Sequence, residues 1–393
     1  LFVAIATGWY RGRRCSERPA AGFELPGQAH SEFRCRLEGH GDGAIDSFIG
    51  ALEVNSETFE THVELGNLLR RKGEVDGATR VHQNLLARPG LPPPQLHLAY
   101  LELARDYISA GLLDRAEALL LDLVGESPQQ RRASQRHLLE IYQSERDWPR
   151  AIEVARGLLP LQSAAGLSSD YDAVESGQEV GVMISHYCCE LAAEKSRAGE
   201  RQQARALLRE ALEQDGQCVR ASLMLAELEA DSGHYRRAIK AFRAVRRQDP
   251  DFLPETIALL RKCHGELGDE RGFRDYLDES LERAPSAPLV LARADYLLET
   301  EGSETAGEFL SAQLAERPSL RGLSRLIGLH LQSSEGKARE DLDLLQLLVS
   351  RLLSERPAYR CSHCGFSGRH LHWLCPGCKY WGTIKLAHGP TAG

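Results

Sequence analysis

The sequence predicts an all-α protein, a solenoid of stacked helical hairpins that ends in a small cysteine-rich module. Two observations support this prediction. Small residues typical of close helix contacts recur about every 34 residues, and two Cys-x-x-Cys pairs follow the last helical stretch. Of the 393 residues, 42% are hydrophobic but only 6% are aromatic. This composition suits a long seam of leucine and alanine better than a single globular core.

One hairpin is readable between Leu65 and Gly90. Apolar residues at helical spacing occur on both sides of Gly73, which is expected to break the helix. The pair Leu65-Gly66 and the small residue Ala78, twelve positions after Gly66, match the closest helix contacts of tetratricopeptide repeats. Neither helix can bury its apolar face alone, so the hairpin is expected to recur.

The small marker residue does recur, and the intervals are 34, 38, 35, 53, 34, 35 and 33 residues. Most lie close to the tetratricopeptide period of 34, and the two longer ones are expected to contain insertions. Any antiparallel helical array shows small residues at contacts, but the period favours about eight or nine tetratricopeptide repeats. Prolines twelve residues after a marker, at Pro128, Pro250 and Pro318, are expected to follow helix ends. The markers are Ala44, Ala78, Ala116, Ala151, Ala204, Ala238 and Ala306, with Phe273 in the same frame.

The first fourteen residues resemble the end of a transmembrane helix. An apolar stretch from Leu1 to Gly8 is followed by Trp9 and Tyr10 and then by three arginines. About ten helical residues are too few to cross a bilayer, which needs roughly 20, so the front half of the anchor is expected to be missing. A cleaved signal peptide and a buried amphipathic segment are the alternatives. If the stretch is an anchor, the arginines are expected to place the rest of the chain in the cytoplasm.

The sequence is expected to divide into four regions. Residues 1–14 are the end of the anchor, 15–28 a linker rich in Pro, Gly, Ala and Glu, 29–355 the repeat array, and 356–393 the metal-binding module. In a reducing compartment the cysteines before the module are expected to be free thiols, most of them in the core. These are Cys15, Cys35, Cys188, Cys189, Cys218 and Cys263.

Several stretches resemble chemical motifs, but a structural role is favoured for each. The segment 39–43, Gly-His-Gly-Asp-Gly, resembles a phosphate loop but lacks the following Gly-Lys-Ser/Thr, so a turn is expected. The segment 186–189, His-Tyr-Cys-Cys, is expected inside a helix, as core and flank rather than a nucleophile pair. Residues 161–181 are expected to form an inter-repeat loop. No familiar catalytic signature occurs, and the net charge of −8 argues against a nucleic-acid partner for the array.

The strongest chemical signal is the pair of cysteine knuckles, Cys361-x-x-Cys364 and Cys375-x-x-Cys378. Two such turns complete a tetrahedral four-sulfur site, and four protein ligands leave no open position for a substrate. The site is therefore expected to be structural rather than catalytic. Neighbouring histidines are less favoured ligands, and these are His363, His370 and His372.

The metal is expected to be zinc, with iron as the alternative. Sulfur-only sites accept both metals. The second knuckle, Cys-Pro-Gly-Cys, is similar to that of rubredoxins, which carry one electron on iron. The gap of ten residues between the knuckles is shorter than theirs, leaving little chain to shield a redox iron.

The module is also basic and aromatic: from Arg356 onward it has five Arg or Lys residues, no Asp or Glu, and five aromatic rings. Such a surface suits RNA. The favoured interpretation is that so small a module, unable to build its own core, packs these groups against the acidic helical array. The rings belong to Tyr359, Phe366, Trp373, Tyr380 and Trp381.

The order of these parts resembles the lipopolysaccharide assembly protein B family of Gram-negative bacteria. The stretches that carry the resemblance are LGNLLRRKGEVDGATRVHQ at 65–83, LARDYISAGLLDRAE at 103–117, and YRCSHCGF with WLCPGCKYWGTIK from 359 onward. The region 161–181 looks longer than is usual in that family. The resemblance covers the whole chain.

The resemblance implies a non-catalytic adaptor on the cytoplasmic face of the inner membrane, anchored by one N-terminal helix. It implies two protein partners, the membrane protease FtsH and the UDP-acyl-N-acetylglucosamine deacetylase of lipid A synthesis. Bringing them together limits lipopolysaccharide production, and lipopolysaccharide or other assembly proteins are further possible partners. The resemblance assigns Cys361, Cys364, Cys375 and Cys378 as metal ligands, and residues 1–10 to contact with the membrane and the protease.

Overall fold

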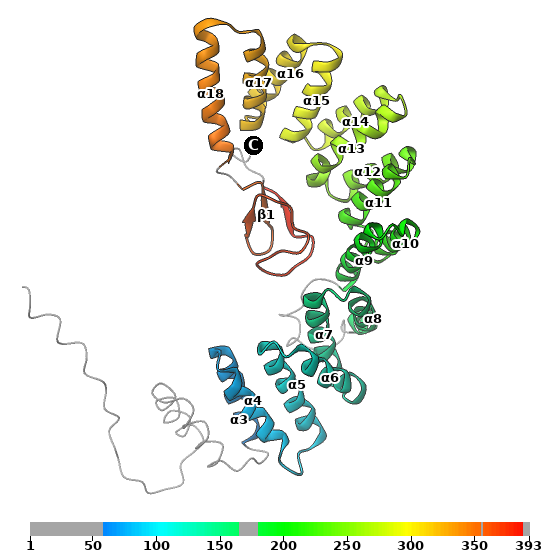
Figure 1. Cartoon of the computed structure of the whole chain (residues 1–393), viewed down its shortest axis with the longest axis vertical. Helices are drawn as coiled ribbons and strands as arrows, with labels where there is room; N and C mark the ends of the chain where they lie inside the picture. Colours follow the sequence, from blue (N-terminus) through cyan, green and yellow to red (C-terminus); the bar gives the residue numbers. More distant parts are fainter. Residues whose placement is uncertain (1–57, 165–179, 355–356, 388–393) are drawn as a thin grey trace, which may run out of the picture. The chain divides into compact units, whose positions relative to one another are not determined.

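The structure is a computed structural model, and it describes residues 58–164, 180–354 and 357–387 of the chain. Two compact units make up the chain, residues 1–123 and 124–393. The first contains the described helices up to most of α6, and the second contains the remaining helices and three short strands. Figure 1 shows the helices in sequence order as antiparallel pairs. Within the described ranges there are eight such pairs.

The first unit begins with the hairpin predicted around Gly73. Helix α3 (Phe59–Lys72) ends at Gly73, and α4 (Val75–Leu86) runs back against it. A side chain at Gly66 would meet the ring of His82, so the Leu-Gly pair does mark a close helix approach. Helices α5 (Pro93–Ser109) and α6 (Leu113–Glu126) follow, and α5 packs on both α3 and α4.

In the second unit each helix from α7 to α18 packs against the next one along the chain. In addition, α9, α11, α13, α15 and α17, the first helices of successive hairpins, contact one another in turn. This pattern of contacts defines a tetratricopeptide-like solenoid, in which every repeat is stabilised mainly by its neighbours. The helices are α7 (Arg131–Glu145), α8 (Trp148–Ala164), α9 (Val180–Arg197), α10 (Arg201–Gln214), α11 (Val219–Asp231), α12 (Tyr235–Gln248), α13 (Leu253–Glu266), α14 (Glu270–Arg283), α15 (Ala287–Thr300), α16 (Ser303–Glu316), α17 (Leu320–Ser333) and α18 (Gly336–Ser354).

The repeat markers are confirmed as close-packed positions. All six described alanine markers, from Ala78 to Ala306, are fully buried, and Phe273 is 2% exposed. The three prolines placed twelve residues after a marker each lie two residues beyond a helix end, because α6, α12 and α16 stop at Glu126, Gln248 and Glu316. The hydrophobic periodicity therefore predicted both the contacts and the ends of these helices.

One predicted boundary was wrong, and several predictions lie outside the described residues. The bounds expected for the loop at 161–181 were wrong, because α8 continues to Ala164 and α9 begins at Val180, and residues 165–179 lie outside the described part of the chain. The anchor at 1–14, the linker at 15–28, the turn at 39–43 and the marker Ala44 all lie outside the part that is described. Among the described helices, none is long and apolar enough to cross a membrane.

The cysteine-rich module forms a three-stranded antiparallel sheet. Strand β1 (Tyr359–Cys361) lies between β2 (Ser367–Gly368) and β3 (Ile384–Leu386). Cys361 pairs with Ile384, and an isolated bridge joins Leu374 to Trp381. The small core of this module consists of Cys361, Cys375 and Ile384, with partly buried apolar side chains around them. So few apolar residues cannot stabilise a domain alone.

Candidate metal centre

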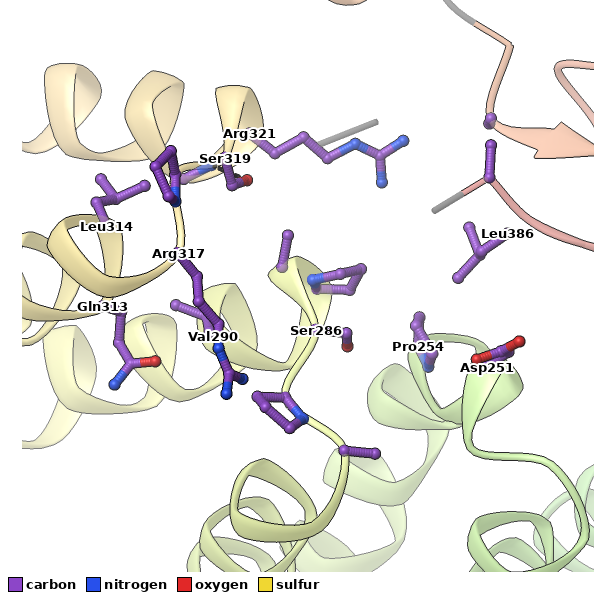
Figure 2. A pocket seen from close by; sticks show the side chains of 18 of the residues that line it. Asp251, Pro254, Ser286, Val290, Gln313, Leu314, Arg317, Ser319, Arg321 and Leu386 are labelled. Atoms are coloured by element: carbon purple, nitrogen blue, oxygen red, sulfur yellow. Dashed lines mark hydrogen bonds between the residues drawn. The ribbon is translucent and has the colours of Figure 1, made fainter. Parts of the chain in front are cut away.

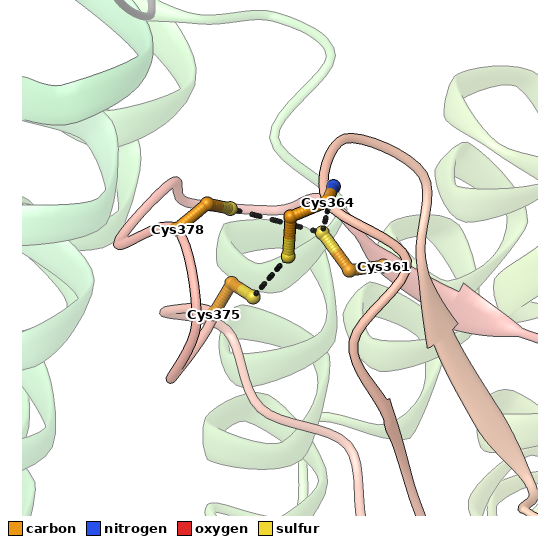
Figure 3. Close-up of side chains that lie close together, drawn as sticks. All are labelled: Cys361, Cys364, Cys375 and Cys378. Carbon is orange, nitrogen blue, oxygen red and sulfur yellow. Dashed lines mark hydrogen bonds between the residues drawn. The ribbon is translucent and has the colours of Figure 1, made fainter. Parts of the chain in front are cut away.

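The four cysteines predicted as ligands come together at one point of the module (Figure 3). Their sulfur atoms all lie within 4.8 Å of one another. The Sγ atoms of Cys361 and Cys378 are 3.8 Å apart, and those of Cys364 and Cys375 are 3.6 Å apart. A tetrahedral ion with metal–sulfur bonds of about 2.3 Å needs sulfurs about 3.8 Å apart. The arrangement therefore fits one four-coordinate ion.

Each knuckle is a tight turn whose backbone reverses after the second cysteine. Gly365, directly after Cys364, has φ 77°, and Lys379, directly after Cys378, has φ 60°. The amide of Cys364 donates a hydrogen bond to the Cys361 sulfur at 3.4 Å. Such N–H groups stabilise thiolates and are the outer contacts expected around a metal held by sulfur.

The environments of two of these thiols differ. Burial acts to raise the pKa of Cys361, but its hydrogen bonds with the Cys364 amide and the Thr383 hydroxyl outweigh this effect and lower the pKa to about 6. Burial raises the pKa of the Cys378 thiol, as do hydrogen bonds with neighbouring cysteines. Thiolates that lie close together repel one another, so the last of the four thiols is hard to deprotonate. A cation at the centre offsets this repulsion and favours four thiolates.

The neighbouring histidines are placed elsewhere. The ring of His363 stacks on Tyr380 with centroids 4.2 Å apart, and His372 lies edge-on to Phe366. In the described part of the chain, the only group of potential metal ligands that converges is the cysteine set. The donor set is thus sulfur alone, which suits zinc or iron and not calcium or magnesium.

The module is attached to the repeat array through Trp381, which is 2% exposed. Its indole ring stacks on His186 of α9, with centroids 5.0 Å apart, and lies edge-on to Tyr187 and Trp148. The indole nitrogen donates a hydrogen bond to the side-chain oxygen of Gln143, at 3.1 Å. Residues from α7, α8 and α9 therefore form a closed socket for this one ring.

Trp373 makes a second contact further along the array. It stacks on Phe252, the last residue of the short helix η2 (Pro250–Phe252), with ring centroids 5.3 Å apart. The guanidinium carbon of Arg220 lies 5.9 Å from the ring centres of both Trp373 and Trp381. Arg220 is held by Glu190 at 3.0 Å, so a fixed cation lies between the two tryptophans.

Polar contacts lie around these rings. Lys385 pairs with Asp249 at 2.8 Å, and the hydroxyl of Tyr359 donates to Glu255 at 2.7 Å. Burial and this carboxylate together raise the pKa of Tyr359 to about 12. The guanidinium of Arg369 donates to the carbonyl of Ser354. The prediction that the rings and charges of the module pack on the array is borne out at these residues.

The surface of the repeat array that contacts the module was not predicted from the sequence. The segment 186–189 was expected to be core and flank, yet all four residues are buried, and His186 and Tyr187 contact the module. Burial raises the pKa of Cys188 to about 12 and that of Cys189 as well, so neither is an activated nucleophile. The available signal was the placement of Trp148 and Tyr187 on adjacent predicted helices of an aromatic-poor chain.

The fold and the site define the class of protein: a tetratricopeptide solenoid that carries a rubredoxin-like metal-binding module. A tetratricopeptide repeat family model matches residues 197–263, and a rubredoxin metal-binding domain model matches residues 359–385. Over nearly their full lengths, two curated proteins are similar to this chain. Lipopolysaccharide assembly protein B of Escherichia coli K12 is 34% identical over 99% of this chain and 97% of its own, and that of Haemophilus influenzae is 32% identical over 98% and 96%. The chain belongs to the lipopolysaccharide assembly protein B family.

A solved tetratricopeptide repeat protein from Parabacteroides merdae overlaps 75% of this chain and all of its own, with 16% sequence identity and a TM-score of 0.33. A TM-score of this size does not establish a common arrangement of the repeats. Membership of the family rests on the full-length sequence similarity and on the two matched modules.

Proposed function

We propose that Cys361, Cys364, Cys375 and Cys378 hold one structural metal ion, zinc in preference to iron. The bound ion would link two knuckles that are otherwise joined by three short strands. The sulfur spacing supports this proposal, and so does the short chain between the knuckles. Metal analysis of the purified protein tests it: one zinc per chain and no visible absorption are expected. A coloured protein with one iron per chain would favour the redox alternative.

We further propose that the chain is a non-catalytic adaptor that regulates lipopolysaccharide synthesis. In this proposal the array presents the UDP-acyl-N-acetylglucosamine deacetylase to the protease FtsH at the cytoplasmic face of the inner membrane. The observation that carries it is full-length membership of the family together with a solenoid fold, whose exposed surfaces bind proteins. Holding client and protease on one scaffold raises their effective concentration.

The same proposal gives each region of the chain a role in the adaptor. Residues 1–14 would end the membrane anchor, 15–28 would tether the array at 29–355, and 356–393 would form the metal module. The four sulfurs close the proposed metal site to substrate, and the buried thiols of α9 have raised pKa values. A metal site closed by four sulfurs supports a structural rather than a catalytic role for the ion.

The experiment is co-purification from membranes, followed by measurement of the lifetime of the deacetylase in cells. The full chain should retain both partners and shorten that lifetime, whereas a chain without residues 1–14 should still retain the deacetylase but leave its lifetime long. Retention of neither partner by the full chain would rule out the adaptor proposal.

Retention of RNA that weakens with salt would instead favour an RNA-binding scaffold. The burial of Trp381 counts against that alternative, because base stacking needs accessible rings.

A further inference from the structure

A cavity of 480 Å³ lies where the metal module approaches the repeats of α12 to α17 (Figure 2). Its walls are three inter-repeat turns, those before α13, α15 and α17, together with residues of the module such as Leu386 and Ala387. Its volume falls in the range of roughly 300–1,000 Å³ that is typical of ligand sites. Unlike the metal centre, this cavity has no role in the function proposed so far.

The lining of the cavity is mostly apolar. Leu314, Val290 and Leu386 contribute aliphatic groups. Proline side chains are rigid and the residue lacks a backbone N–H, so these walls are preformed and offer few donors to a ligand. The prolines that line the cavity are Pro250, Pro254, Pro285, Pro288, Pro318 and Pro357.

The polar groups are few and mainly cationic or neutral. Arg317 follows the end of α16 and Arg321 lies in the first turn of α17. In Figure 2 Arg317 lies on the side of the cavity opposite Leu386, whereas the Arg321 side chain extends toward the side of Leu386. Within the described ranges neither guanidinium has a hydrogen-bond or ion-pair partner, so both are available to a ligand. Asp251 is the one acidic residue of the lining. The lining of the cavity therefore carries an excess of positive charge.

The hydroxyl of Ser286 is a further polar group of the lining, and it lacks the hydrogen bond expected at its position. Ser286 occupies the N-cap position of α15, but its hydroxyl makes no capping hydrogen bond. Its Oγ atom is buried and, in the part of the chain that is described, has no hydrogen-bond partner. By contrast Ser319, at the N-cap of α17, accepts a hydrogen bond from the amide of Gly322. A buried hydroxyl without a partner is unfavourable, and a ligand that hydrogen-bonds to it removes this cost.

We propose that this cavity binds a short extended peptide segment of a partner protein, in which an acidic residue is flanked by apolar residues. Arg317 and Arg321 attract the acidic group from two sides of the cavity, Ser286 offers it a hydrogen bond, and the apolar side chains contact the proline walls. A free phosphate would pair with the arginines but would make no contact with the apolar lining. A peptide can do both, so the combination of cationic and apolar groups favours a peptide. This inference rests on the proposed adaptor function and assigns it a contact surface.

The test uses the metal-loaded full chain and fluorescein-labelled octapeptides that tile the deacetylase and the cytoplasmic part of the protease. Binding is measured by fluorescence anisotropy. At least one octapeptide with an acidic residue between apolar residues should bind, and its Asp→Asn or Glu→Gln version should bind about tenfold more weakly. Arg321→Glu and Arg317→Glu should each weaken binding by about tenfold or more. Arg236→Glu, an exposed arginine of α12 outside the cavity, is the matched control and should leave affinity unchanged.

Three results would overturn the proposal. They are the absence of peptide binding at high micromolar concentration, equal weakening by Arg236→Glu, and displacement of a bound peptide by millimolar inorganic phosphate. Failure of the adaptor function is recognised separately, because co-purification of the intact deacetylase does not depend on this cavity being the contact. Retention of the deacetylase without peptide binding would reject the cavity and keep the adaptor.

Discussion

The imidazole ring of His186 lies almost parallel to the indole ring of Trp381, with ring centroids 5.0 Å apart and planes 16° apart. One residue belongs to helix α9 and the other to the module that carries the four cysteines. Each ring is buried, so the pair excludes water from the centre of the interface. The attachment of the module therefore depends on a small number of rings whose removal has distinct consequences.

Replacing Trp381 by alanine should release the module while leaving its metal in place. Truncation of a buried tryptophan costs about 3–5 kcal/mol, and this one also loses its hydrogen bond to Gln143. Hydrogen exchange should become faster in residues 359–387 and in α9, with one metal ion still bound per chain. Tyr380→Ala is the control, because that ring stacks on His363 inside the module. Unchanged exchange in Trp381→Ala would mean that other contacts hold the module.

Replacing Cys375 by serine should remove tight metal binding and leave most of the helical signal. A solenoid repeat depends mainly on its neighbours, so disruption at one end does not unfold the rest. Metal content and far-ultraviolet circular dichroism measure the two effects. Cys263→Ser removes a buried thiol of α13 and should keep the metal. Loss of the whole helical signal in Cys375→Ser would show that the array needs the metal to fold.

The buried imidazole predicts a pH dependence. Burial, with a smaller effect of the nearby Arg220 cation, lowers the pKa of His186 from 6.5 to about 3. Between these values the unfolded chain binds a proton that the folded chain does not, so stability is complete above about pH 6.5 and falls as the pH decreases. At pH 5.5 the loss is about 1.4 kcal/mol.

The comparison with His186→Gln isolates this effect from protonation of the cysteines, which both proteins share. Urea denaturation at pH 7.5 and pH 5.5 gives the free energy of unfolding for each. The wild-type protein should lose about 1.4 kcal/mol more than the variant over this interval. An equal loss in the two proteins would show that His186 becomes protonated without unfolding.

Replacing Gly382 by alanine should also weaken the interface. Gly382 has φ 65°, and an added Cβ would lie 3.2 Å from the His186 ring. The left-handed backbone alone costs an alanine about 1–2 kcal/mol. Thermal unfolding of the module should shift to lower temperature, whereas Gly307→Ala, in the open interior of α16, should be neutral or stabilising by up to about 1 kcal/mol. Equal thermal stability of Gly382→Ala and wild type would contradict the close approach.

Local patterns predicted much of this molecule. The knuckles need only a spacing of three residues and a reversing residue such as Gly365, and the hairpins need only a period of about 34. The socket is different, because the hydrogen bond from Trp381 to Gln143 joins residues 238 positions apart. The cavity of Arg317 and Arg321 likewise needs three separate turns to converge. Contacts of this kind depend on how successive hairpins are stacked, which a degenerate repeat does not encode locally.

We propose that the ion site of the module is closed by four sulfurs and stabilises the module that packs on the repeat array. X-ray absorption at the metal edge of the purified full chain tests it most directly. We expect four sulfur scatterers at about 2.3 Å and no nitrogen or oxygen ligand. Three or fewer sulfurs together with a water or another light atom would reveal an open coordination position, and would contradict a purely structural site.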